Sequence, residues 1–158
     1  MARLDLQNLL DILSGMAEME RTLAGLYRCC AEAWPADEAF WRHLAEEEME
    51  HAQHIGEMAE QIRRTPECFE LQRPFNLAAI RTILAGVKRN AESIRQGLIS
   101  RERAFVLARD LESSILEKAY HEIVKTDDRN YLDLIRRIVS QTLLHKNAIE
   151  TKIREPRP

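Results

Sequence analysis

The chain has 158 residues, which is the length of one ordinary domain and enough to bury a hydrophobic core. It is 45% apolar and 31% charged with only 5 Gly and 5 Pro, which excludes a chain rich in loops or disorder. The formal net charge of -3 gives no electrostatic reason to expect nucleic acid, and no apolar run approaches the ~20 residues that span a membrane. We therefore expect one domain over residues 1–158, with neither a nucleic-acid nor a membrane partner.

The cysteines and the start of the chain favour a cytoplasmic protein. The three cysteines, Cys29, Cys30 and Cys68, are an odd set with two neighbours, which is not the pattern of a disulfide framework. Residues 1–5 lack the apolar region of a signal peptide. The sequence also has no Cys-x-x-Cys pair of the kind that holds zinc or a rubredoxin iron, so we expect free thiols.

The first half of the chain predicts two long helices joined by a short link. Apolar residues recur with helical period from about residue 5 to residue 33, and again from 37 to 64. Pro35 separates the two patterns, because proline does not continue a helix. Two further prolines in residues 65–74 end the second pattern. The short link predicts an antiparallel hairpin.

The second half predicts a shorter helix followed by two more long ones. Residues 75–96 carry helical period, and Gly97 is the expected stop. We expect the third long helix to run from a cap at Ser100 to about Lys125, and the fourth to follow the cap candidates in residues 126–128. Two hairpins joined by a crossover with its own helix predict an all-α fold, a four-helix bundle with one long crossover.

Each long helix has an apolar stripe that polar residues interrupt near its middle. These residues are Glu20 on the first helix, Glu48 and His51 on the second, Glu112 on the third, and Thr142 and His145 on the fourth. A carboxylate that faces a helical core costs several kcal/mol in desolvation unless a positive group meets it. No Lys or Arg falls on the stripes at this level. We therefore expect a bound cation.

The spacing of these residues also suits a metal site. Glu48 and His51 are three residues apart, so they share one face of a helix and can hold one ion. Carboxylate and imidazole donors together suit iron or manganese, and zinc by affinity. Should the register of the second helix be shifted by one residue, Glu47 would take the place of Glu48. We expect the other histidines, His43, His54 and His121, at the surface, although His54 lies one turn beyond His51 and could support it.

In these residues the chain resembles the ferritin-like di-iron carboxylate proteins, most closely the rubrerythrin-like branch. That family takes one Glu from each of two helices and a Glu-x-x-His from each of the other two. Residues 48–51 match the first Glu-x-x-His. Glu20, with Tyr27 seven residues later, resembles the first-helix ligand and its nearby tyrosine.

The second hairpin matches the family less completely. Glu112 resembles the third-helix ligand, and His145 resembles the histidine of the second Glu-x-x-His. Thr142 departs from the pattern, because it stands where the family has a glutamate that bridges two metals. The resemblance implies five metal ligands, with no catalytic residue assigned beyond them: Glu20, Glu48, His51, Glu112 and His145.

The resemblance implies iron as the cofactor, as one or two ions, with manganese or zinc as alternatives. It implies an oxidoreductase in which Fe(II) meets peroxide or dioxygen, as in a rubrerythrin-like peroxidase. The chain lacks the cysteine-rich rubredoxin domain, so an external electron donor would be needed, and we expect a homodimer. Because the crossover has helical period, iron storage in a cage is less expected. The alternative is a non-catalytic helical-bundle homo-oligomer whose polar centre is a relic.

Overall fold

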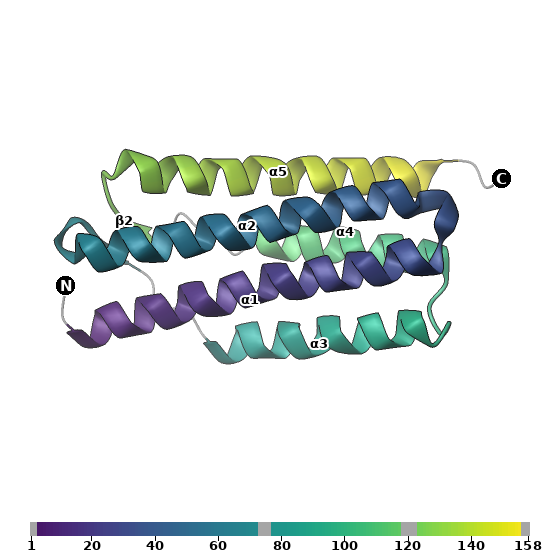
Figure 1. The fold of residues 1–158 in the computed structure, drawn as a ribbon, viewed down its shortest axis with the longest axis horizontal. Helices are drawn as coiled ribbons and strands as arrows, with labels where there is room; N and C mark the ends of the chain where they lie inside the picture. Colours follow the sequence, from purple (N-terminus) through teal and green to yellow (C-terminus); the bar gives the residue numbers. More distant parts are fainter. Residues whose placement is uncertain (1–2, 73–76, 118–122, 156–158) are drawn as a thin grey trace.

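The computed structural model describes residues 3–72, 77–117 and 123–155, and within these ranges the protein is all-α apart from two very short strands. This confirms that the fold is all-α, as predicted. The five described α-helices are α1 (Arg3–Ala33), α2 (Glu38–Arg64), α3 (Leu77–Arg95), α4 (Arg101–Glu117) and α5 (Arg129–Arg154) (Figure 1). None of the described helices is both long and apolar enough to cross a bilayer.

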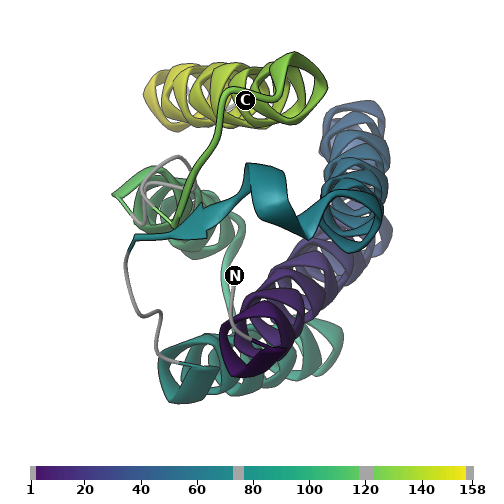
Figure 2. The same ribbon diagram turned by 90° about the vertical axis from the view of Figure 1, so that its left-hand side faces the viewer.

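The five helices lie side by side with their long axes roughly aligned (Figure 1). Viewed end-on, α1, α2, α4 and α5 surround a common interior, while α3 lies on the outer side of α1 (Figure 2). α1 packs most extensively on α2 and also contacts α3, α4 packs on α5, and a contact between α2 and α5 joins the two pairs. The crossover segment therefore does contain a helix of its own, as the sequence predicted.

The link between α1 and α2 is tied to the start of α4. Pro35 begins a short 3₁₀ turn, Pro35–Asp37, which reverses the chain. The buried carboxylate of Asp37 accepts two hydrogen bonds from the guanidinium of Arg101, at 2.6 and 3.0 Å. A bidentate pair of this kind fixes orientation as well as adding energy. It holds the two hairpins together at this end of the molecule.

The crossover helix buries one face, and its ends follow the predicted signals. Its buried residues recur at helical spacing and are Ile80, Leu84, Val87, Ala91 and Ile94. Gly97 follows with a φ of 69°, a left-handed conformation that glycine adopts without strain and that commonly ends a helix. The hydroxyl of Ser100 then accepts a hydrogen bond from the backbone amide of Arg103 at 3.3 Å, so it caps α4 as predicted.

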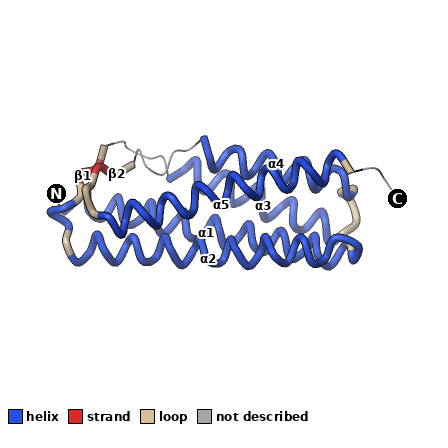
Figure 3. The backbone as a smooth tube through the Cα atoms, turned by 90° about the horizontal axis from the view of Figure 1, so that it is seen from above, coloured by secondary structure: helices blue, strands red, loops and turns tan. Residues whose placement is uncertain are grey.

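The prediction that the third long helix reaches Lys125 is wrong. α4 is described to Glu117, and Val124–Lys125 form β2, which pairs antiparallel with β1 (Glu70–Leu71) at one end of the molecule (Figure 3). The amide of Gln72 also donates to the carbonyl of Ile123 at 3.0 Å. Ile123 and Val124 are β-branched and buried, so they pack as well in an extended segment as in a helix. Residues 118–122, His121 among them, lie outside the described residues.

The fourth long helix begins where the sequence placed it. The side chain of Asp128 accepts a hydrogen bond from the backbone amide of Tyr131 at 2.9 Å and so caps α5. The buried residues of α5 repeat at helical spacing along its inner face: Tyr131, Ile135, Ile138, Thr142, His145 and Ile149. The predicted register of α5, and with it the inward placement of Thr142 and His145, is confirmed.

Candidate metal centre

The structure brings the five predicted site residues together in the interior. Glu20 lies on α1, Glu48 and His51 on α2, Glu112 on α4 and His145 on α5, and none of them is more than 2% exposed. They fall into two groups whose ligand atoms lie within 4.8 Å of one another. One group is Glu20, Glu48 and His51, and the other is Glu48, Glu112 and His145. Glu48 belongs to both groups.

The two oxygens of Glu48 face two different histidines. Oε2 lies 3.1 Å from Nδ1 of His51, on the same helix. Oε1 lies 2.8 Å from Nδ1 of His145, which comes from α5. The two imidazole rings are nearly parallel, with their centroids 5.5 Å apart. A carboxylate placed in this way can bridge two neighbouring ions.

Glu112 is held by the tyrosine that the sequence placed near the site. The hydroxyl of Tyr27, itself completely buried, donates a hydrogen bond to Oε1 of Glu112 at 2.5 Å. Burial and the negative charges of Glu112 and Glu48 raise the pKa of Tyr27 well above its usual value, so the phenol keeps its proton. Burial and the charge of Glu48 raise the pKa of Glu112 to about 7. Tyr27 therefore orients Glu112.

His145 supplies a positive charge at the centre. Burial opposes that charge, but the close carboxylates of Glu112 and Glu48 outweigh it and raise the pKa of His145 to about 11. For Glu48 burial acts to raise the pKa, but its contacts with His145 and His51 prevail and lower the pKa to about 2. In the absence of a metal, the imidazolium of His145 is thus the counter-ion of Glu48. The sequence argument considered only Lys and Arg and missed this partner.

Several ligand atoms of the second group suit a cation placed between them. Oε1 of Glu48, Oε2 of Glu112 and Nδ1 of His145 are buried without a hydrogen-bond partner among the described residues. The 2.8 Å approach of Nδ1 to Oε1 is an ion pair whose orientation does not make a hydrogen bond. Buried polar atoms in this condition are costly. A cation coordinated by all three atoms would remove that cost, so the residues fit a bound metal.

Each group offers two carboxylates and one imidazole. Donors of this mixture suit iron and manganese, and zinc also binds them. Three protein ligands per ion leave further coordination positions for water or a small molecule. The donor set therefore agrees with the metals expected from the sequence.

The outer nitrogens of both histidines have partners that the sequence did not identify. Nε2 of His51 lies 3.1 Å from Oε1 of Gln141, and Nε2 of His145 lies 2.7 Å from Oε2 of Glu47. Metal-binding histidines usually hydrogen-bond through the nitrogen that faces away from the metal. Glu47 and Gln141 each lie one helical turn before the site histidine of their own helix but contact the histidine of the other helix, so the spacing alone gave no signal. Glu47 does not replace Glu48, so the predicted register of α2 holds.

Thr142 faces the interior as predicted but is not an acidic ligand. It is buried, and its hydroxyl donates to the carbonyl of Ile138 one turn earlier on α5 at 2.8 Å. The hydroxyl oxygen keeps lone pairs, but a neutral hydroxyl is a much weaker ligand than the carboxylate expected from the family. Of the remaining histidines, His43 is 68% exposed, as predicted.

Comparison of the chain with protein-family models, with curated proteins and with solved structures finds no match. The resemblance to ferritin-like proteins therefore rests on the residues of the centre and their spacing alone.

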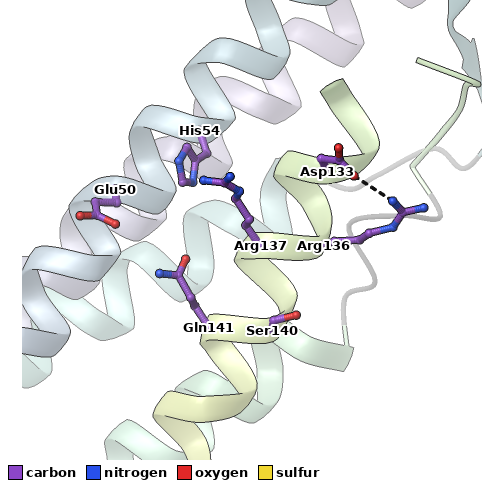
Figure 4. A pocket seen from close by; sticks show the side chains of 7 residues that line it. All are labelled: Glu50, His54, Asp133, Arg136, Arg137, Ser140 and Gln141. Carbon is purple, nitrogen blue, oxygen red and sulfur yellow. Dashed lines mark hydrogen bonds and ion pairs between the residues drawn. The ribbon is translucent and has the colours of Figure 1, made fainter. Parts of the chain in front are cut away.

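A surface pocket of about 560 Å³ adjoins the centre between α2 and α5 (Figure 4). Its lining side chains are polar or charged: Glu50, His54, Asp133, Arg136, Arg137, Ser140 and Gln141. Gln141 extends from α5 toward α2 and is also the residue that contacts Nε2 of His51 (Figure 4). His54 thus lines this pocket, half-buried, instead of supporting His51 directly. The pocket brings solvent close to one edge of the centre.

Proposed function

We propose that the protein binds two transition-metal ions, iron or manganese, at a dinuclear centre. The first position consists of Glu20, Glu48 and His51, and the second of Glu48, Glu112 and His145. The observation that carries this proposal is that Glu48 belongs to both groups, with one oxygen toward each histidine. Glu48 is then the bridging carboxylate, and the centre needs no second bridge at Thr142 to hold two ions.

The arrangement of the helices supports a ferritin-like fold for this proposal. Helices α1, α2, α4 and α5 each contribute to the centre, and the crossover that contains α3 separates the two hairpins. This is the plan of a four-helix bundle with one crossover and a metal site between its helices. We therefore propose that the bundle is ferritin-like.

We further propose an oxidoreductase activity toward peroxide or dioxygen, of the rubrerythrin type. Iron bound at the centre would supply the redox chemistry. The chain's own residues neutralise and position it: three carboxylates balance the cations, Tyr27 orients Glu112, and the surrounding core keeps bulk water away. Cys29 and Cys30 are buried and Cys68 is exposed, and no cysteine joins either described ligand group, so electrons would come from a separate donor.

One observation favours the alternative, a non-catalytic bundle. The short contact of His145 with Glu48 already balances charge at the centre without a metal. Such a protein would serve as a helical homo-oligomer with a relic site. Leu143 and Leu144 on α5, 48% and 65% exposed, are apolar residues that a second copy of the chain could cover. We propose a homodimer under either function.

Metal content separates the two functions. Protein purified without chelator from iron-rich medium is assayed for iron, manganese and zinc, and then stripped and titrated anaerobically with Fe(II). The proposal expects two ions per chain after reconstitution, and Fe(II) oxidation by hydrogen peroxide followed by absorbance. A protein that binds no metal before or after reconstitution is the non-catalytic bundle. A protein that binds metal but reacts with neither hydrogen peroxide nor dioxygen has the metal site without the proposed oxidoreductase activity.

A further inference from the structure

The surface pocket between α2 and α5 is large enough to hold a small organic molecule. Its volume is about 560 Å³, within the range of roughly 300–1,000 Å³ that ligand pockets occupy in proteins. α2 contributes Glu50 and His54 to its wall, and α5 contributes the other lining residues. None of these side chains belongs to either described group of metal ligands. The pocket is therefore a second feature of the fold, with a chemistry of its own.

Arg137 gives this pocket a positive charge that no described carboxylate neutralises. Its side chain is exposed and makes no hydrogen bond or ion pair with any residue that the structure describes. Arg136, the other arginine of the wall, donates to the carboxylate of Asp133 at 2.8 Å, so these two charges balance each other. The carboxylate of Glu50 is turned away from Arg137 (Figure 4). The unpaired guanidinium favours an anionic ligand.

His54 reaches the same space from the other helix. The guanidinium of Arg137 extends from α5 toward the imidazole of His54 on α2 (Figure 4). Nδ1 of His54 is buried and has no hydrogen-bond partner among the described residues, a costly state for a polar atom. A guanidinium presents N–H donors in a planar fork that matches two oxygens of a carboxylate or phosphate. An oxyanion held by this fork would lie next to His54, whose neutral ring still has one N–H to donate.

The rest of the wall indicates what such a ligand carries besides its charge. Ser140 offers a hydroxyl group and Gln141 an amide, and no apolar residue of the described chain lines the pocket. An apolar ligand would displace water from these groups without replacing its hydrogen bonds, whereas hydroxyl groups on the ligand would replace them. The wall therefore favours a ligand rich in hydroxyl groups.

We propose that this pocket binds a small hydroxylated anion, a hydroxy acid or a sugar phosphate, whose carboxylate or phosphate is held by Arg137 and His54. The two head groups share the chemistry that a guanidinium recognises. The bound anion would lie beside the proposed metal centre, because Gln141 both lines the pocket and contacts Nε2 of His51. The inference does not rest on metal binding, since Arg137 and His54 belong to neither ligand group.

Four probes show which part of a ligand the pocket recognises. Gluconate has a carboxylate and hydroxyl groups, glucose 6-phosphate has a phosphate and hydroxyl groups, sorbitol has hydroxyl groups without charge, and hexanoate has the charge without hydroxyl groups. Proton–nitrogen correlation spectra of the full-length, metal-free protein give the Kd of each probe and the residues that respond. The titrations are made at low ionic strength, where an exposed charge is least screened.

We expect gluconate, glucose 6-phosphate or both to bind roughly 10–100-fold more tightly than sorbitol, which is the effect of one hydrogen-bonded contact to a charged group. The same anion should bind more tightly than hexanoate and should shift the amide signals of residues 50–54 and 133–141. If neither anion binds more tightly than sorbitol, the inference is wrong. Hexanoate binding as tightly as both anions would overturn the assignment of a hydroxylated ligand.

Variants of Arg137 locate the binding. In Arg137→Gln the tighter of the two anions should bind no better than sorbitol. Arg137→Lys keeps the charge but loses the planar fork, so its affinity should fall between those of Arg137→Gln and the unaltered protein. Arg129→Gln is the matched control, because Arg129 is an exposed arginine of α5 outside the pocket. Equal losses in Arg137→Gln and Arg129→Gln would show attraction to the overall charge and overturn the inference.

These measurements separate failure of the anion site from failure of the proposed function. If the anion binds at Arg137 but the protein takes up no metal, the inference stands and the proposed metal function is wrong. If the protein binds two metal ions but no anion, the metal function stands and the inference is wrong. Because Arg137 is exposed, its variants should fold, and the comparison of the four probes on the unaltered protein decides even if they do not.

Discussion

Oε1 of Glu48 lies 2.8 Å from Nδ1 of His145, and both side chains are almost completely buried. Without a metal this contact is an ion pair between a carboxylate and an imidazolium. With a metal, the same two atoms become ligands and the proton on Nδ1 has to leave. The centre is therefore a place where protons and metal ions compete for the same atoms.

Metal uptake should release protons, and affinity should rise with pH. The pKa of His145 is raised to about 11 and that of Glu112 to about 7, so near neutral pH the metal-free centre holds one proton on His145 and part of one on Glu112. Because both residues must lose their protons to bind, we expect roughly one to two protons released per chain at neutral pH. Calorimetry of Zn(II) binding in buffers of different ionisation enthalpy counts them.

The variant His145→Gln provides the control for this count. It removes the ligand whose pKa is raised to about 11, so the release should fall by roughly one proton per chain. Above the pKa of Glu112, near 7, the pH dependence of the unaltered protein should become shallower, because His145 alone still holds a proton. If no proton is released, neither residue binds the metal, and a release of about one proton that does not change with pH would show that Glu112 does not bind it.

Removing Glu48 should destabilise the metal-free protein. Glu48→Gln leaves the imidazolium of His145 without the buried carboxylate that faces its Nδ1, and breaking a buried ion pair from one side costs about 3 kcal/mol or more. Urea unfolding of chelator-treated protein measures the loss. Glu46→Gln, an exposed position on the same helix, is the matched control and should change the free energy of unfolding by less than about 0.5 kcal/mol.

A double variant tests whether the loss of stability comes from the ion pair between Glu48 and His145. Replacing Glu48 and His145 together by Gln removes both charges, so the double variant should lose less stability than the sum of the single variants. If Glu48→Gln instead stabilises the metal-free protein, the carboxylate is an uncompensated charge and the ion pair does not form in solution.

Tyr27→Phe should weaken the second metal position more than the first. The substitution removes the hydroxyl that donates to Oε1 of Glu112, and a buried hydrogen bond of this kind is worth about 1–2 kcal/mol. Glu112 is then free to rotate away from His145. Metal titration should show the change at the weaker of two binding steps, and thermal unfolding should show the loss of stability. Tyr131→Phe, a buried tyrosine that packs on Phe69, should leave both metal affinities unchanged.

The interior faces of the helices could be predicted because burial follows the helical period. Thr142 and His145 lie three residues apart within the apolar stripe of α5, and both are buried as that stripe requires. The same reasoning failed at the end of α4. Ile123 continues the apolar spacing of the helix, but the pairing of Val124 with Leu71 in another segment decides its conformation, and periodicity carries no information on such a partner.

The hydrogen-bond partners of the two site histidines could not be predicted from the same helical period. Glu47 and Gln141 lie at the edge of their stripes, where a polar residue is normally solvated. Their role depends on how closely α2 approaches α5 at this level, which no feature of either helix alone specifies. The charge on His145 was missed for a similar reason, because its pKa depends on its distances to Glu48 and Glu112.

The substitution Thr142→Glu should restore the glutamate that the family has at this position and make the stability of the protein depend on bound metal. Position 142 is buried on the inner face of α5, three residues before His145, so a carboxylate there would point toward the centre and complete a second Glu-x-x-His. In the metal-free protein it adds a negative charge beside buried carboxylates, and stability should fall by several kcal/mol. With Fe(II) or Mn(II), that charge becomes a ligand, so stability should recover as metal is added.

Thermal unfolding at rising metal concentration measures the recovery, and Asn147→Glu is the matched control. Asn147 is an exposed polar residue of α5, so a carboxylate there stays in solvent and should leave both stability and metal binding unchanged. In Thr142→Glu we expect tighter binding at the position of Glu112 and His145 and faster oxidation of Fe(II) than in the unaltered protein. If the variant folds but its melting temperature responds to metal no more than that of Asn147→Glu, position 142 does not reach the ions. The second position would then have to be placed further from α5 than the contact of His145 with Glu48 implies.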